Sequence, residues 1–166
     1  LRKSVYTEDL AVKHKFPLVR LHEGGGGSVA GPSKEKKGYG GDPVFARSRF
    51  KSVAQTLKEV PVVSAALGPV AGLPASRFVG SHFRIMVKDN AQILVAGPAV
   101  VSRAFGKDFT KEELGGSDVH KKNGVTDNIA ESEEDAFNQI KKFLSFFPAN
   151  IYELPPHKES KDETDR

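Results

Sequence analysis

The sequence contains four consecutive glycines, at residues 24–27, whose backbone N–H groups are candidates for a catalytic role. They stand in the stretch R-L-H-E-G-G-G-G-S-V, which covers residues 20–29. Glycine has no Cβ and adopts conformations that other residues avoid, so a glycine bend can turn successive N–H groups toward a ligand. Such groups stabilise an oxygen that becomes negatively charged during a reaction. The same composition is typical of a flexible tether, and this stretch alone leaves both interpretations open.

Other common reaction centres are not indicated. The sequence has no cysteine, which excludes disulfides and thiolate chemistry. No G-K-[S/T] follows the glycines, so they do not match a nucleotide-binding P-loop. His120 is expected to make a structural hydrogen bond, and His22, which precedes the glycine turn, is expected to help to shape that turn rather than to transfer protons. We expect no metal, because no pair of histidines has metal-ligand spacing with a third ligand nearby; the histidines are His14, His22, His82, His120 and His157.

The composition is that of an ordinary globular protein. The 166 residues are enough for one domain with a core. The formal net charge of +4 and the sequence pI near 9.2 are mildly basic, which does not by itself indicate nucleic-acid binding. No apolar run approaches the roughly 20 residues of a membrane helix, and the first residues do not resemble a secretory signal. We therefore expect neither nucleic acid nor a membrane as a partner.

Alternating helices and strands are predicted to position the glycines. Such alternation is typical of an α/β fold with a largely parallel sheet. In these sheets ligands bind beyond the carboxyl ends of the strands, and two glycine-containing turns, residues 24–27 and 68–72, follow strands at that edge. Helical patterns cover residues 2–15, a segment from Asp42 and Pro43 to about residue 59, residues 97–105 and residues 132–147; strand patterns cover residues 16–21, 61–67, 83–87 and 91–96.

Local signals support several of these elements. Val5, Val12 and Phe16 can share one side of the first helix. Thr110 and Glu113 match a capping box. Ser132 can cap the last helix, whose apolar face is predicted from the spacing of Ala136, Ile140, Phe143, Leu144 and Phe147.

Four longer stretches carry a family resemblance. They are F-P-L-V-R-L-H-E-G-G-G-G, P-V-V-S-A-A-L-G-P-V-A-G, F-R-I-M-V-K-D-N-A-Q-I-L-V-A-G-P-A-V-V, and E-E-L-G-G-S-D-V-H-K-K-N-G-V-T-D-N-I-A with the later F-P-A-N and L-P-P. Together they resemble the carboxyltransferase (β) subunit of biotin-dependent acyl-CoA carboxylases, in the crotonase superfamily. The resemblance implies a crotonase-like ββα superhelix, here an incomplete acyl-CoA-binding domain at residues 1–156, with a polar disordered tail at residues 157–166.

The resemblance also assigns a task to the glycines. In the family, CO2 moves from carboxybiotin to the carbon next to the thioester carbonyl of an acyl-CoA, through an enolate. Aligned to the family's S-G-G-A, Gly25 and Gly26 are the expected N–H donors to the enolate oxygen, with Gly24 and Gly27 at the flanks. The turn at Gly72 corresponds to the place of another donor, although a purely structural turn is the alternative there.

Two further features of the sequence bear on the acyl-CoA. Family members usually have G-G-A after the second turn, whereas this chain has Gly72, Leu73 and Pro74. Leu73 adds bulk where it would contact the thioester, and Pro74 has no N–H to donate. Lys36 and Lys37, in a basic stretch at residues 34–51, could attract the phosphates of CoA or form a solvated face.

The function implied by the resemblance is that of an acyl-CoA carboxyltransferase unit. Its expected partners are a biotin carboxylase or biotin carrier subunit, and another carboxyltransferase half or a second copy. Its expected location is the mitochondrial matrix in a eukaryote and the cytoplasm otherwise. The alternatives are a crotonase-like decarboxylase, hydratase or isomerase, and a non-catalytic fragment that binds CoA or a subunit. The sequence does not identify the acyl group.

Overall fold

The structure is a computed structural model that describes residues 2–25, 49–157 and 159. Several predictions fall outside these residues and stay predictions: the helix start at Asp42 and Pro43, most of the polar tail, and the site residues Gly26, Gly27, Lys36 and Lys37. The elements in chain order are α1 (Arg2–His14), β1 (Leu18–Gly25), α2 (Arg49–Glu59), β2 (Val62–Ala71), α3 (Leu73–Val79), β3 (Phe83–Val87), β4 (Gln92–Leu94), α4 (Pro98–Phe105), α5 (Lys111–Gly115), α6 (Ser117–Asn123), β5 (Asn128–Ala130) and α7 (Glu133–Leu144).

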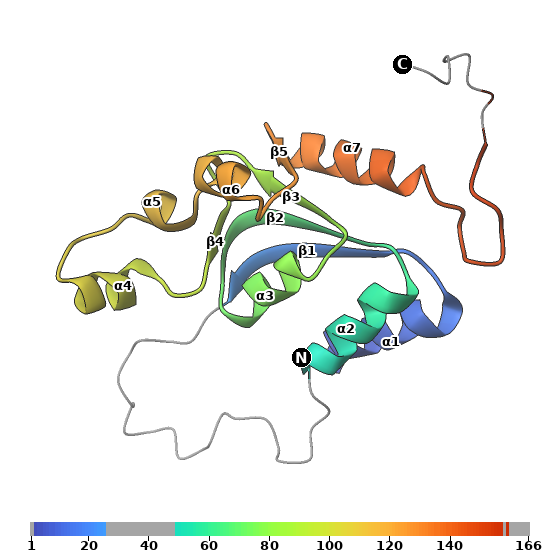
Figure 1. The fold of residues 1–166 in the computed structure, drawn as a ribbon, viewed down its shortest axis with the longest axis horizontal. Coiled ribbons are helices and arrows are strands. Elements are labelled where there is room, and N and C mark those ends of the chain that lie inside the picture. The colour runs from blue at the N-terminus through green and yellow to red at the C-terminus, as the bar shows by residue number, and fades with distance from the viewer. Residues whose placement is uncertain (1, 26–48, 158, 160–166) are drawn as a thin grey trace.

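The strands form one parallel sheet in the order β1-β2-β3-β5, with β4 beside the end of β2. Figure 1 shows α7 along one face of this sheet and α1, α2 and α3 on the opposite side. The predicted α/β architecture with a largely parallel sheet is confirmed. No helix in the described part of the chain is long and apolar enough to cross a membrane.

The strand β2 is longer than the sequence predicted. A turn was expected at residues 68–72, but β2 continues through Gly68 and Pro69 to Ala71. Two irregularities accommodate them: the pairing with β1 shifts register opposite this segment, and the other edge of β2 changes partner from β3 to β4. Glycine and proline are tolerated where pairing is irregular. The extension places the end of β2 beside the end of β1.

The main core packs both α7 and α3 against the sheet. Ala136 and Ile140 of α7 are buried, and the ring of Phe143 stacks on Phe83 of β3 with the ring centroids 5.0 Å apart. The side-chain oxygen of Ser132 accepts a hydrogen bond from the N–H of Asp135 at the start of α7. The predicted cap of this helix is therefore confirmed, as is the capping box at the start of α5. The apolar face is confirmed as far as Leu144, where the helix ends, so Phe147 lies beyond it.

The buried side of the first helix was predicted only in part. Val5 and Val12 are half-buried, as expected, but Phe16, which follows α1, is 51% exposed, and Glu8 is buried on the side of the two valines. The reason is electrostatic, because the carboxylate of Glu8 faces two arginines from other elements. The short elements α6 and β5 were not predicted at all. A strand of three residues is too short to show alternation.

Candidate functional site

The glycine bend begins as an ordered strand end. Gly24 and Gly25 are the last residues of β1 and pair with Val70 and Ala71 of β2. Their φ angles are +78° and +105°, in the region that favours glycine. A Cβ on Gly25 would lie 2.7 Å from Cγ of Pro74. Over these two residues the chain is therefore a tight bend packed against the start of α3 rather than a tether.

The second glycine turn faces the first. Gly72 connects β2 to α3 with φ 69° and ψ −130°, and its own N–H donates to the carbonyl of Leu94 over 3.1 Å. Its part in this conformation is to shape the turn. Leu73 occupies the first position of α3, where an N–H has no intrahelical acceptor, and Pro74 follows without an N–H.

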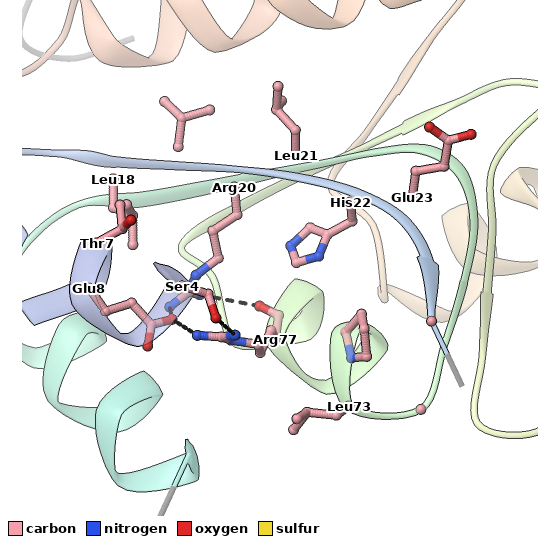
Figure 2. Close-up of a pocket in the computed structure, with 14 residues that line it drawn as sticks. Ser4, Thr7, Glu8, Leu18, Arg20, Leu21, His22, Glu23, Leu73 and Arg77 are labelled. Atoms are coloured by element: carbon pink, nitrogen blue, oxygen red, sulfur yellow. Dashed lines mark hydrogen bonds and ion pairs between the residues drawn. The ribbon is translucent and has the colours of Figure 1, made fainter. Parts of the chain in front are cut away.

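A cavity of about 700 Å³ opens between these turns and the side chains of α1, β1 and α3. Gly25, Gly72, Leu73 and Pro74 line one end of it. Figure 2 shows the side chains of Arg20 and His22 on the cavity side of β1, and those of Leu21 and Glu23 on the other side. This alternation is what a β-strand imposes.

The other end of the cavity carries a buried ion cluster, formed by Glu8 of α1, Arg20 of β1 and Arg77 of α3. Nη2 of Arg20 donates to Oε1 of Glu8 over 2.9 Å, and Nη2 of Arg77 donates to the same oxygen. The hydroxyl of Ser52, from α2, donates to the second carboxylate oxygen over 2.7 Å. The three charged side chains are only 2–11% exposed. The cluster therefore joins three helices to the edge strand.

The two guanidinium groups are incompletely satisfied. Nη1 of Arg20 donates to the carbonyls of Gly80 and Arg77, and Nη1 of Arg77 donates to the hydroxyl of Ser4. The Nε atoms of both arginines are buried without a hydrogen-bond partner among the described residues. Burial lowers the pKa of Arg20; Glu8 opposes this shift and Arg77 adds to it. One carboxylate thus faces two buried cations.

His22 lies between the ion cluster and the glycine bend. Its Nε2 is 3.1 Å from the hydroxyl oxygen of Ser64, which in turn is 2.7 Å from that of Ser81. Burial, with Arg20 and Arg77 nearby, lowers the pKa of His22 from 6.5 to about 4. The imidazole is therefore neutral near pH 7. His120 contacts the carbonyl of Ile93 through Nε2 over 2.8 Å, which is the structural hydrogen bond expected of it.

The predicted site residues within the described part of the chain come together. Gly25, Gly72 and Leu73 line the same cavity, and Gly24 directly precedes Gly25 in the bend. Their assigned roles remain predictions. Over residues 2–25, 49–157 and 159, no group of three or more histidine and acidic residues is gathered as a metal site.

The ion cluster was missed by the sequence analysis. Arg20 and His22 stand at alternate positions of a strand that begins with the buried Leu18. This alternation places the side chains of Arg20 and His22 on the same buried side of the strand as Leu18. It therefore indicates that both side chains need buried polar partners. Glu8 and Arg77 are far from Arg20 in sequence, and nothing in a single sequence pairs them.

Comparison with known proteins identifies the family of this chain. The carboxyl transferase domain family matches residues 1–166. This decides the family. The chain belongs to the carboxyl transferase domain family.

Individual relatives agree with this membership. The domain is 32% identical to methylmalonyl-CoA decarboxylase subunit alpha of Veillonella parvula over 99% of this chain and 31% of that protein. It is 29% identical to the mitochondrial propionyl-CoA carboxylase beta chain of Homo sapiens over 95% of this chain and 28% of the relative.

A solved structure supports the fold of the carboxyl transferase domain. Transcarboxylase 12S, a hexamer with methylmalonyl-CoA and methylmalonic acid bound, superposes with a TM-score of 0.71 at 25% identity, over 97% of this chain and 30% of that one. The fold is that of crotonase-like carboxyltransferases. The domain spans less than a third of the length of each of these proteins.

Proposed function

We propose that this chain forms the acyl-CoA-binding part of a carboxyltransferase. The proposed reaction moves a carboxyl group from carboxybiotin to the carbon next to the thioester carbonyl of an acyl-CoA. The observation that carries the proposal is the bend at Gly25, which faces Gly72 and Leu73 at the end of a cavity. The activity, substrates and partners of the relatives support it, although the chain spans less than a third of their length.

The glycine bend suits the charged intermediate of this reaction. Loss of a proton from the acyl carbon moves negative charge onto the thioester oxygen. We assign the N–H groups of Gly25 and Gly26 to this oxygen, with Gly24 and Gly27 allowing the bend. Fixed N–H groups in a site that excludes water stabilise such charge without reorganising during the reaction. Gly72 holds the facing turn, and we assign to Leu73, which lines the cavity, a contact with the acyl group.

The remaining parts of the proposal concern partners. Carboxybiotin, carried by a biotin carrier subunit that a biotin carboxylase serves, supplies the activated carboxyl group. Lys36 and Lys37 are proposed to contact the CoA phosphates. The hexamer assembly of transcarboxylase 12S supports assembly of this chain with other carboxyltransferase halves or copies. By the same reasoning we place the protein in the mitochondrial matrix of a eukaryote, as in the human relative, or in the cytoplasm of a prokaryote.

Decarboxylation of an acyl-CoA is the second candidate. It is favoured by the 32% identity with a methylmalonyl-CoA decarboxylase subunit. Both reactions pass through the same enolate, so the glycine bend serves either. An assay of the full-length protein with its biotin-carrying partner separates them. Carboxylation of propionyl-CoA driven by ATP supports the first function, whereas release of CO2 from methylmalonyl-CoA without ATP supports the second.

The primary test is calorimetric titration of the full-length protein with acetyl-, propionyl- and methylcrotonyl-CoA. We expect at least one thioester to bind. In the active assembly, Gly25→Ala should lower kcat on the order of 100-fold, the effect of losing one oxyanion donor, because the new Cβ would displace Pro74 and the bend. Gly124→Ala is the matched control, since Gly124 also has a positive φ, of +75°, but has open space around its Cβ position.

Two results would contradict the proposal. Absence of binding for these three thioesters, and for a dicarboxylic acyl-CoA such as glutaryl-CoA, at high concentration would contradict an acyl-CoA-binding role. Equal turnover of Gly25→Ala and Gly124→Ala would remove the glycine bend from the mechanism, whatever the overall activity.

A further inference from the structure

The ion cluster contains more positive than negative charge on its side of the cavity. The charged or titratable side chains that face it there are Arg20, Arg77, Glu8 and His22. His22 is neutral, and the Glu23 side chain lies on the opposite side of β1 (Figure 2). The described residues thus leave one buried positive charge without a counter-ion. Buried charges are usually paired because their desolvation is costly.

The hydrogen bonding of the two arginines also indicates that an anion is missing. Arg20 and Arg77 are about nine-tenths buried, and the Nε atom of each has no partner among the described residues. The Nε and Nη groups of an arginine form a planar fork that matches the two oxygens of a carboxylate. A missing carboxylate would correct both the charge and the unpaired donors.

We propose that Arg20 and Arg77 bind a carboxylate at the far end of the acyl chain, so that the preferred substrate is the CoA thioester of a dicarboxylic acid; this inference rests on the proposed function. Leu73 and Arg77 are four residues apart on α3, about 6 Å along the helix axis. The thioester at the glycine bend and a carboxylate at Arg77 are therefore separated by a short acyl chain. A five-carbon diacid is the first probe to use.

The location favours an acyl carboxylate over a phosphate of CoA. Both arginines line the cavity at the other end from the residues assigned to the reacting thioester, and both donate to the Glu8 carboxylate of α1. A nucleotide phosphate would need the bulky ribose and adenine to enter the same space. A terminal carboxylate requires only the acyl chain to do so.

The test compares glutaryl-CoA with valeryl-CoA, which has the same number of acyl carbons but no terminal charge, by calorimetric titration of the full-length protein. Charge-assisted hydrogen bonds of this kind predict at least about ten-fold tighter binding of glutaryl-CoA. Equal affinities would overturn the inference and leave the proposed function standing. If neither of these two thioesters binds although acetyl-, propionyl- or methylcrotonyl-CoA does, the inference fails and the proposed function stands; if none of the five thioesters binds, both fail.

Substitutions test whether the arginines cause the preference for glutaryl-CoA over valeryl-CoA. Arg77→Met should reduce the preference for glutaryl-CoA to about two-fold or less, with valeryl-CoA affinity nearly unchanged. Arg84→Met is the control, because Arg84 is also paired with a carboxylate, that of Asp127, but does not line the cavity. Glu8→Gln should strengthen glutaryl-CoA binding, since it removes the competing carboxylate. A preference that survives in Arg77→Met protein with native circular dichroism would overturn the inference.

Further comparisons show whether Arg77 binds the acyl carboxylate or a CoA phosphate, and whether a loss of binding is only a folding defect. If Arg77→Met does not fold, the comparison of the two thioesters on the unmodified protein still decides the matter. If Arg77→Met weakens glutaryl-CoA and valeryl-CoA equally, the arginine binds a CoA phosphate and the inference is wrong. Glutaryl-pantetheine, which lacks the nucleotide phosphates, should keep its advantage over valeryl-pantetheine.

Discussion

The two sides of the sheet are held by different forces. Between α7 and the sheet the contacts are apolar, with Ile140 buried and Phe143 stacked on Phe83. Between α1 and the edge strand, a buried carboxylate links Arg20 to Arg77, and only a small apolar cluster around Leu18 accompanies it. Ile140, Phe143 and Phe83 do not line the cavity, whereas Glu8, Arg20 and Arg77 do. The difference shows that the ionic side combines packing with the formation of a cavity wall.

The largest effect is expected from breaking the ionic side. Glu8→Leu leaves two guanidinium groups buried without their counter-ion, which should lower the free energy of unfolding by about 3–5 kcal/mol. Urea unfolding followed by circular dichroism measures this. A triple variant, Glu8→Leu with Arg20→Met and Arg77→Leu, should recover most of the loss, because an apolar replacement of a whole buried ion cluster is often neutral. A single variant that loses less than about 1 kcal/mol would show the cluster to be well solvated.

A somewhat smaller effect is expected on the apolar side. Ile140→Ala on α7 removes a buried side chain from the main core and should cost about 2–4 kcal/mol, the range for large-to-small core substitutions. The same unfolding experiment applies. Ile140→Val is the matched control and should cost about 1 kcal/mol. The affinity for acyl-CoA should be unchanged in both variants, since Ile140 does not line the cavity.

Acidification should lower the free energy of unfolding through the ionic side, by way of His22, without any substitution. The pKa of His22 is lowered from 6.5 to about 4 by burial and the two arginines. Between these values the unfolded chain takes up a proton that the folded chain does not, so the free energy of unfolding falls as the pH falls. Over pH 7 to 4.5 the contribution of His22 is roughly 2–3 kcal/mol.

Urea unfolding of the unmodified protein and of His22→Gln at both pH values measures this contribution, because glutamine keeps a hydrogen-bonding side chain but does not titrate. The loss of stability on acidification should be smaller in the variant. An equal loss in both proteins would show that His22 is not buried as a neutral group.

The apolar side was predictable from the sequence and the ionic side was not. The spacing of Ala136, Ile140 and Phe143 predicted the buried face of α7, because apolar periodicity carries that information locally. In α1, the same reasoning chose Phe16, whereas the structure exposes Phe16 and buries Glu8. A carboxylate is buried only when it meets cations, and here these come from β1 and α3, which are distant in sequence.

The candidate site also has one part that the sequence predicted and one part that it did not. The glycine bend was predictable, since it depends on a local property of residues 24–27. The facing arrangement of Gly25 and Pro74 and the arginines of the cavity wall depend on how three elements pack. Leu73 and Pro74 were recognised as departures from the family pattern, but only the structure shows that the Pro74 ring lies where a side chain at position 25 would need to be.

This close packing constrains how the protein can vary among species. The Pro74 ring and the bare backbone of Gly25 fit each other, with 2.7 Å between Cγ and the site of an absent Cβ. Gly25 also has a φ of +105°, and its Cβ position lies 3.0 Å from the carbonyl oxygen of Ala71, so a smaller residue at position 74 would not by itself admit a side chain at position 25. Orthologues should therefore keep glycine at position 25 whatever residue they carry at position 74.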